Sequence, residues 1–339
     1  MTLIQGCNPS FFEEEGDCDP VHVVRFVYDK NMKFADAFHA EVPSVTLFVF
    51  DEDGHLVTSV ARHVKAEESQ DFSIELRDIP MGHYNLLAWC GVVDTPHFNI
   101  NPEGVAAPEI HHHICRIDRE IEAQDGSHHI RKDLGRLFHG RLDDVDMTQD
   151  EGTHVHTLKL TKDTNVIRVT LQHMSGEEMN PDDYDIFIGD ANGLYDHNND
   201  LLPDEEITYH PWSIKGGVAS FHPEDQPKQD ARAQTSVSAV VAELTVGRLI
   251  ADRNEKVFLS VYNHHTGAKI LSIPLIDYLL LVKGNYYSED GISPMSDQDY
   301  LDRQDDYPMT FFLDESGSWI KTVIYINSWR VVKNESSVH

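Results

Sequence analysis

The clearest chemical signal in this 339-residue chain lies near its start, in the tetrapeptide Ile4-Gln5-Gly6-Cys7. Signals of bacterial lipoproteins end in a box of this kind, with an aliphatic residue three positions before the cysteine and a small residue directly before it. The pattern predicts that a signal peptide is removed and that the sulfur of Cys7 carries lipid. The alternative is an ordinary thiol in an unstructured tail.

The segment that follows Cys7 has no apolar periodicity, which predicts a tether over residues 1–20. It carries four closely spaced acidic residues: Glu13, Glu14, Glu15 and Asp17. It also contains no Lys or Arg between Cys7 and Arg25. A protease that cuts after basic residues therefore finds no site in the tether.

Histidine is abundant, with 21 copies that include the run His111 to His113 and the pair His128 and His129. Adjacent side chains on a strand or loop point in different directions, whereas zinc sites use defined ligand spacings. We therefore expect no metal site here. An enzyme built on this run would require His111 to His113 to converge with a carboxylate in one pocket.

A second candidate is a calcium loop, because Asp196, Asn198 and Asp200 match the first three ligand positions of an EF-hand. Leu201 stands where the EF-hand glycine belongs, and Ile207 stands where its last glutamate belongs. These differences exclude an EF-hand and leave a looser loop of oxygen ligands as a weak calcium candidate.

Composition and the lack of known motifs exclude further classes of function. Lys and Arg total 27 against 58 Asp and Glu, giving a net charge of −31, and so acidic a surface repels nucleic acid. The chain contains no nucleotide-binding, nucleophile-elbow or zinc-protease motif, so we expect neither an enzyme nor a cofactor. Apart from Cys7 it has Cys18, Cys90 and Cys115, an odd number from which sequence cannot choose a disulfide pair.

The elements that position these residues are mainly strands. Short runs rich in branched and aromatic residues alternate with turns, which predicts an all-β fold. In the first half these runs are 21–28, 44–50, 55–61, 72–76 and 83–89. Helical spacing is limited to 31–42 and to two insertions, "LIDYLLLV" and "SDQDYLDRQ".

An internal repeat indicates two similar units. "VVRFVYD" followed by "LFVFDEDG" is echoed by "VIRVTLQ" followed by "DIFIGDANG". Arg25 corresponds to Arg168 and Gly54 to Gly193, at nearly equal offsets. We therefore expect β-sandwich domains in tandem over residues 21–150 and 151–339.

The last long apolar run, "WIKTVIYINSWRVV", is apolar on both faces in its middle. Such a strand is covered on both sides or is waiting to be covered. Its residues Trp319, Val323, Tyr325 and Trp329 are the candidate donor or interface strand for a partner.

Several stretches together resemble the FimB-type fimbrial anchor lipoproteins, the minor-fimbria anchor subunits of the fimbrillin superfamily. The resemblance rests on Cys7 with its acidic cluster, "CDPVHVVRFVYDKNMKFADAF", "VTLFVFDEDGHLV", "MGHYNLLAWCG", "LFHG" and "QDYLDRQDDYPMTFFLDESGSWIKTVIYINSW". It extends from Cys7 to about Val332. Cys90 departs from the pattern, because a glycine is expected after the Ala-Trp pair.

The resemblance implies two tandem transthyretin-like β-sandwich domains with short helical insertions. It also implies an outer-membrane lipoprotein, surface-exposed and acylated at Cys7, with Glu13, Glu14, Glu15 and Asp17 as a sorting tag. Its implied partner is a fimbrial shaft subunit, at the base of a type V (strand-exchange) pilus whose length it limits. The alternative is a surface lipoprotein that binds glycans on an open platform formed by Trp89, Trp212, Trp319 and Trp329.

Overall fold

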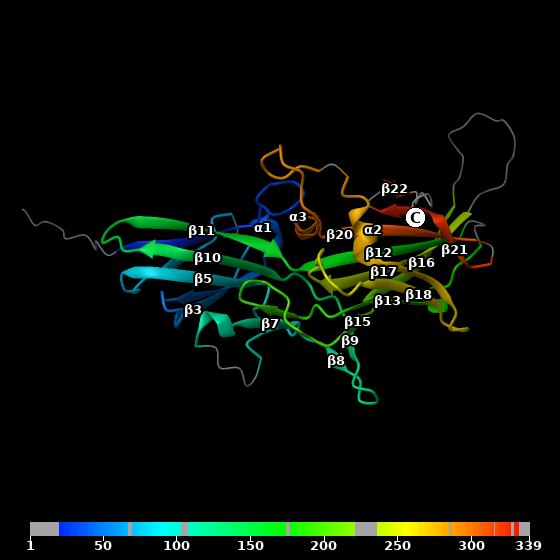
Figure 1. Cartoon of the computed structure of the whole chain (residues 1–339), viewed down its shortest axis with the longest axis horizontal. Helices are drawn as coiled ribbons and strands as arrows, with labels where there is room; N and C mark the ends of the chain where they lie inside the picture. Colours follow the sequence, from blue (N-terminus) through cyan, green and yellow to red (C-terminus); the bar gives the residue numbers. More distant parts are fainter. Residues whose placement is uncertain are drawn as a thin grey trace, which may run out of the picture.

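The computed structural model describes residues 20–66, 70–102, 108–173, 177–220, 236–284, 286–314, 316–326 and 329–331. Strands dominate this part of the chain and the helices are short, so the expected all-β class is confirmed (Figure 1). None of the described helices is long and apolar enough to cross a membrane. Cys7, Glu13, Glu14, Glu15 and Asp17 lie outside the described ranges.

Seven strands of the first unit form one sheet, with the helix α1 (Phe38–Glu41) beside it. The strands are β1 (Val21–Val27), β2 (Ser44–Phe50), β3 (Leu56–His63), β4 (Ser73–Leu76), β5 (Gly82–Cys90), β10 (Phe138–Met147) and β11 (Thr153–Lys162). Their order is β3-β2-β5-β10-β11-β1-β4. Only three residue pairs join β10 to β11, and apolar side chains of β1, β2, β5 and β11 share one core, so the sheet folds over on itself at this point.

The chain between β5 and β10 leaves the first sheet and packs against the second unit. It contains β6 (Phe98–Ile100), the 3₁₀ turn η1 (Ile110–His112), β7 (Ile114–Ile117), β8 (Glu120–Ile121) and β9 (His128–Ile130). Cys115, Ile117 and Ile130 from this segment lie in the core of the second unit.

The second unit is a pair of six-stranded sheets that share one core. One sheet has the order β16 (Ser213–Ser220), β17 (Ser236–Gly247), β12 (Thr164–His173), β20 (Asp306–Leu313), β21 (Trp319–Ile326) and β22 (Trp329–Val331). The other has the order β19 (Lys269–Pro274), β18 (Phe258–Asn263), β13 (Tyr184–Asp190), β15 (Ile207–Tyr209), β9 and β8. A third, smaller sheet joins β14 (Leu194–Asp196) to β7 and β6, and the turn η2 (Pro181–Asp183) precedes β13.

The two units repeat one strand order. In the first, β3-β2-β5-β10 is followed by β11-β1-β4; in the second, β15-β13-β18-β19 corresponds to the first series and β20-β12-β17 to the second. The first strand of each unit is also parallel to a late strand, β1 to β11 and β12 to β20. Arg25 and Arg168, the matched residues of the sequence repeat, lie in these two first strands.

Strand pairing divides the chain differently from the expected boundary between residues 150 and 151. The strand after that boundary, β11, belongs to the first sheet, whereas β8 and β9 before it extend a sheet of the second unit. The apolar pattern of a segment predicts that it is a strand but contains no information on which distant strand it pairs with. The hydrophobic periodicity of the sequence therefore could not locate the boundary between the two units.

The two predicted helical insertions are present between β19 and β20, as α2 (Leu275–Leu280) and α3 (Asp297–Arg303). Ser296 caps α3 by accepting a hydrogen bond from the backbone N–H of Asp299 at 3.0 Å. In the first unit no helix separates the corresponding strands, β10 and β11. Figure 1 shows α3 between the two units, beside the loop that follows β1.

Candidate functional site

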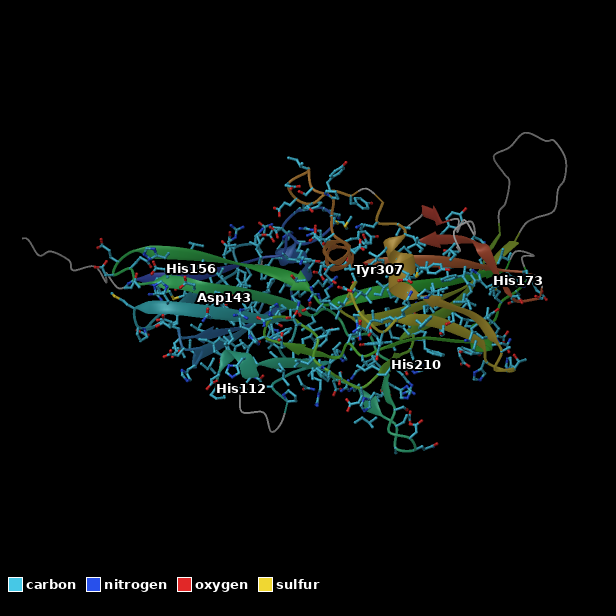
Figure 2. The ribbon with its side chains drawn as sticks, in the orientation of Figure 1. His112, Asp143, His156, His173, His210 and Tyr307 are labelled. Atoms are coloured by element: carbon cyan, nitrogen blue, oxygen red, sulfur yellow. The ribbon has the colours of Figure 1, made fainter. Side chains whose placement is uncertain are left out.

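The first described strand, β1, begins at one end of the molecule. Its first residue, Val21, donates a backbone hydrogen bond to Gly152 O at 2.9 Å, and β1 then runs parallel to β11 along its whole length. Both strands begin at the left end of Figure 1. At the same end His22 Nδ1 lies 3.1 Å from His156 Nε2, and Figure 2 shows His156 on β11.

Arg25 is the first basic residue after the tether, and it lies in the middle of a strand. Its backbone is registered with Thr157 of β11 on one side and with Ser73 of β4 on the other. The side chain is 58% exposed and reaches Asp36 at 3.7 Å. A protease needs an extended, unpaired segment in its cleft, so cleavage after Arg25 would require β1 to leave the sheet first.

The C-terminal candidate strand is two strands rather than one. β21 pairs with β20 along one edge and with β22 along the other. Trp319 and Tyr325 are half-buried, with ring centroids 5.9 Å from Phe311 and 5.7 Å from Phe312. Val323 lies within β21 and Trp329 begins β22, while their side chains lie outside the description.

The strand β22 is the last strand of its sheet among the described residues. Its inner edge pairs with Ile324 to Ile326, and its outer edge faces away from the sheet. In Figure 1 β22 lies in the right half of the molecule, far from the end where β1 and β11 begin. The start of β1 and this sheet edge are therefore separated along the long axis.

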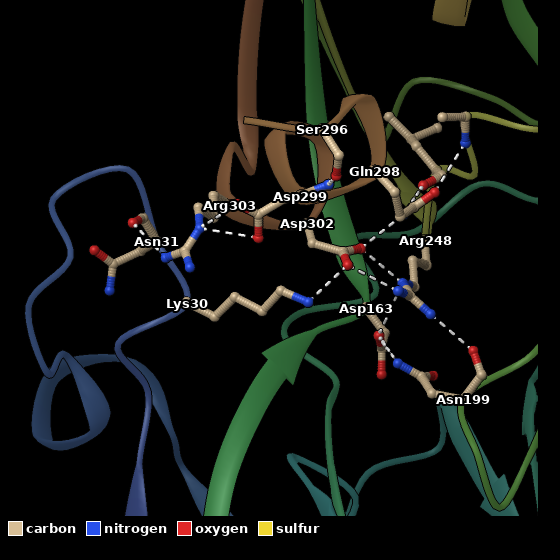
Figure 3. A network of polar contacts seen from close by, with 12 residues as sticks. Lys30, Asn31, Asp163, Asn199, Arg248, Ser296, Gln298, Asp299, Asp302 and Arg303 are labelled. Carbon is tan, nitrogen blue, oxygen red and sulfur yellow. Dashed lines mark hydrogen bonds and ion pairs between the residues drawn. The ribbon is translucent and has the colours of Figure 1, made fainter. Parts of the chain in front are cut away.

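A buried polar network joins the two units (Figure 3). Asp302 of α3 accepts two contacts from Arg248, each of 2.8 Å, and one from Lys30 Nζ at 2.9 Å. Arg248 also donates to Asn199 O at 2.8 Å, and the amide of Asn199 donates to Asp163 Oδ1 at 2.7 Å. Lys30 belongs to the first unit and the others to the second or to its border, so this junction network fastens one unit to the other.

The two carboxylates of the junction network have opposite pKa shifts. Burial raises the pKa of Asp163 to about 7, against the opposing charge of Arg248. Its Oδ2 has no hydrogen-bond partner in the described part of the chain, which fits a carboxylate that disfavours its charged form. At Asp302 burial acts in the same direction, but the hydrogen bond and charge of Arg248, together with Lys30, hold the pKa below its ordinary value.

A second set of contacts from α3 reaches the first unit. Arg303 donates a hydrogen bond to the carboxylate of Asp299 at 3.0 Å and another to Asp29 O at 3.2 Å. Its guanidinium also lies 4.5 Å from the ring centroid of Phe34. Lys162, at the end of β11, pairs with Asp305. Sequence reasoning missed these residues because partners such as Lys30 and Asp302 are 272 positions apart and no local motif connects them.

Two of the calcium candidates, Asp196 and Asn198, already accept hydrogen bonds through their side-chain oxygens. Asp196 Oδ1 accepts the backbone N–H groups of Asn198 at 2.8 Å and Asp200 at 2.9 Å, while Asn198 Oδ1 accepts from Arg141. This is the geometry of a side-chain-capped turn. Over the described residues, the one group of three or more His, Cys, Asp or Glu side chains close enough to share a metal ion is a different one, Glu109, His111 and His112.

The histidine run does not converge as a whole. His113 is buried between Phe48 and Phe50, whose ring centroids are 4.7 and 4.9 Å away. His111 and His112 are exposed on the opposite side of the turn. The enzyme hypothesis requires all three histidines in one pocket. The structure does not bring them together there.

The tryptophans do not form an open platform in the described part of the chain. Trp89 is fully buried in the core, and Trp319 is half-buried against Phe311. Trp212 is 37% exposed and donates to Thr245 Oγ1 at 3.1 Å. Cys90 and Cys115 are buried free thiols, and Cys18 lies outside the described residues.

The fold defines an elongated, two-unit, all-β protein in which the start of β1 and the outer edge of β22 lie far apart. The family model of the fimbrillin-A associated anchor proteins Mfa1 and Mfa2 matches residues 14–335, and the chain belongs to this family. The family consists of structural fimbrial anchor proteins rather than enzymes.

Individual relatives agree with this assignment. The chain is 23% identical over 217 residues to the minor fimbrium anchoring subunit Mfa2 of Porphyromonas gingivalis, a match that covers 62% of this chain and 63% of the relative. A solved candidate adhesin from Bacteroides thetaiotaomicron has 31% identity and a TM-score of 0.78, covering 95% of this chain and all of that one. A solved structure from the same species, described as candidate polysaccharide-binding proteins, has 28% identity and a TM-score of 0.73 and covers 94% and 99%.

Proposed function

We propose that this protein is an outer-membrane lipoprotein, acylated at Cys7, that anchors a strand-exchange fimbria to the cell surface and limits its length. Its two units would be transthyretin-like β-sandwich domains in tandem, as their repeated strand order supports. Family membership supports association with fimbrial subunits. The observation that carries the proposal is the position of Arg25 inside a strand paired on both edges.

The tether argument follows from that position. Between Cys7 and Arg25 the chain offers no Lys or Arg, and the backbone of Arg25 is held by β4 and β11. A shaft subunit of such a pilus loses its N-terminal segment to an Arg-specific protease, which frees a groove for a neighbour's strand. This chain would keep its segment and therefore its lipid.

The lipid itself would give a lasting hold. Burying an acyl chain stabilises attachment by about 0.8 kcal/mol per CH₂ group, and a single chain holds only reversibly. A lipoprotein cysteine carries several chains, so Cys7 meets the requirement of a base subunit. Glu13, Glu14, Glu15 and Asp17 would then act as the tag that sends the protein to the cell-facing leaflet.

The shaft would join at the far end, through the run that includes Trp319, Val323, Tyr325 and Trp329. Because β21 is paired along both edges, the available position is β22. A partner strand can add to the outer edge of β22 or replace this three-residue strand on β21, and both are β-augmentation.

Metabolic labelling with a fatty acid tests the anchor directly. The precursor with its signal peptide is compared with its Cys7→Ala variant in cells. The proposal expects label in the membrane fraction for the unchanged protein and none for the variant. Equal labelling of both proteins would overturn it.

Glycan binding is the second candidate, favoured by the similarity to the candidate polysaccharide-binding structure. The burial of Trp89 and the packing of Trp319 count against an open tryptophan platform. A glycan array probed with the protein and with Trp212→Ala separates the two functions. Binding that depends on Trp212 would favour the glycan function, and its absence would favour the anchor.

A further inference from the structure

The segment from Pro108 to His113 is fixed to the hairpin formed by β2 and β3. Leu56 N donates to Pro108 O at 2.7 Å, and Ile110 N donates to Gly54 O at 2.8 Å. A single β-bridge pairs His55 with Glu109. The main chain on which Glu109, His111 and His112 stand is therefore held in place by backbone hydrogen bonds.

Two buried side chains, those of Ile110 and His113, anchor the same segment to the protein interior. Ile110 is 9% exposed and belongs to the core of the second unit, while His113 is 1% exposed beneath Phe48 and Phe50. Gly54, with φ of +83°, passes directly over Ile110, where a Cβ would come within 3.3 Å of Cγ2. A turn pinned at Ile110 and His113 leaves the residues between them facing outward.

The turn brings three ligand groups together. The side chains of Glu109, His111 and His112 each offer one atom, and these atoms all lie within 4.8 Å of one another. Glu109 Oε2 is 3.0 Å from His111 Nε2, and the two imidazole centroids are 4.1 Å apart. Adjacent side chains point to opposite faces on a strand, whereas in this turn the side chains of His111 and His112 approach each other and Glu109.

We propose that Glu109, His111 and His112 form a binding site for a divalent transition-metal ion of the Zn²⁺ type. Two imidazoles and a carboxylate are the ligand set that such ions prefer. Bond lengths of about 2.0 to 2.2 Å place tetrahedral ligands roughly 3.3 Å apart, so side-chain rotations on this fixed turn suffice. The fourth position falls to water or to His55, whose Nε2 lies 3.9 Å from Glu109 Oε1.

The site lies on the outer surface of the molecule, where Figure 2 shows His112 at its lower margin. His111 is 57% exposed and the Glu109 side chain 34%, so an ion reaches them from solvent without any opening of the fold. The net charge of −31 raises the concentration of cations at the surface. This inference is independent of the proposed anchor function.

Zinc binding to the purified protein, measured by calorimetry, tests the site, with the visible absorption of bound Co²⁺ as a second readout of tetrahedral geometry. The test variant is His111→Ala/His112→Ala. The matched control is His264→Ala/His265→Ala, another exposed adjacent pair, whose members contact Asp185 at 2.9 Å and Asp183 at 2.8 Å.

We expect one site in the unchanged protein that is tighter than its background binding. Loss of an outer-shell partner already weakens metal binding by 10- to 100-fold, so removing both imidazoles should weaken it by about 100-fold or more. The Co²⁺ spectrum should disappear in the test variant and persist in the control. Glu109→Gln should weaken binding less than the double variant.

Two outcomes would overturn the site. One is unchanged zinc affinity in His111→Ala/His112→Ala, and the other is an equal loss in both double variants, which would indicate adventitious binding by a histidine-rich surface only. Circular dichroism and the melting temperature of each variant, compared with those of the unchanged protein, verify that all variants are folded.

Discussion

The guanidinium of Arg248 donates two hydrogen bonds to the carboxylate of Asp302, from Nε to Oδ1 and from Nη2 to Oδ2, each 2.8 Å long. Arg248 directly follows β17, and Asp302 lies in α3, so this fork holds the helix against the second unit. Lys30 reaches the same carboxylate from the first unit. One aspartate therefore fastens three separate segments of the chain.

Removing that aspartate should destabilise the fold strongly. Asp302→Ala leaves Arg248 buried without its main partner, and breaking a buried pair in this way costs about 3 to 5 kcal/mol. Urea unfolding of the purified protein measures the effect. The control is Glu75→Ala, which breaks the exposed Glu75–Arg77 pair and should cost less than about 1 kcal/mol. Equal losses of unfolding free energy for the two substitutions would show that the junction network stabilises the fold no more than an exposed ion pair does.

Asp163 should give stability an unusual pH dependence. Burial raises its pKa in the folded protein to about 7 from an ordinary value of 3.8. Between these values the folded state binds more protons at this group than the unfolded state, so this contribution to stability falls as pH rises from about 4 to about 7 and is constant above. The slope is at most about 1.4 kcal/mol per pH unit.

Buried histidines act in the opposite direction, so a comparison with a variant is needed. Burial lowers the pKa of His139 to about 4, and its contribution therefore rises with pH between about 4 and 6.5. Asp163→Asn removes the titration of the Asp163 carboxyl and keeps His139 in place. The difference in unfolding free energy between variant and unchanged protein should move in favour of the variant from pH 4 to pH 7. A constant difference would contradict the raised pKa.

The proposal that the tether is retained predicts how a new cleavage site would behave. Gly16→Arg places an arginine between Glu15 and Asp17 without replacing any of the acidic residues. In cells that secrete an Arg-specific protease, this variant should be shed into the medium, while the unchanged protein stays with the membrane. Immunoblots of both fractions measure the ratio.

Gly16→Lys is the matched control, because it makes the same change in charge and flexibility but offers no arginine. It should remain in the membrane fraction. Shedding of the lysine variant, or of the unchanged protein, would mean that the tether is cut without a new arginine and would contradict the argument from Arg25.

The sheet edge at β22 predicts where the shaft attaches. Deleting residues 329–339 removes β22 and leaves the outer edge of β21 unpaired. Cells with this truncation should display the protein at the surface at normal amounts but release most of their fimbriae, as measured in the culture supernatant. Normal attachment with normal display would rule out addition to the outer edge of β22, because only a partner strand that replaces β22 on β21 could still bind the truncated protein.

Much of the fold was readable from local pattern. The strand runs of the first unit and both helical insertions were predicted, because burial on one face imposes a period of two on strands and 3.6 on helices. The repeat of Arg25 at Arg168 reflected two units of one strand order. The lack of Lys and Arg between Cys7 and Arg25 was likewise a fact of the sequence, and the tether remains a prediction.

Pairing between distant segments was decided only by the tertiary structure. Apolar periodicity cannot show that β11 joins β1 across 132 residues, that Lys30 reaches Asp302, or that β21 and β22 pair antiparallel. The histidine run shows the same limit: one 3₁₀ turn, pinned by Ile110, directs His113 inward and groups His111 and His112 with Glu109. Sequence specifies which side chains are available, and only the packed backbone determines which of them meet.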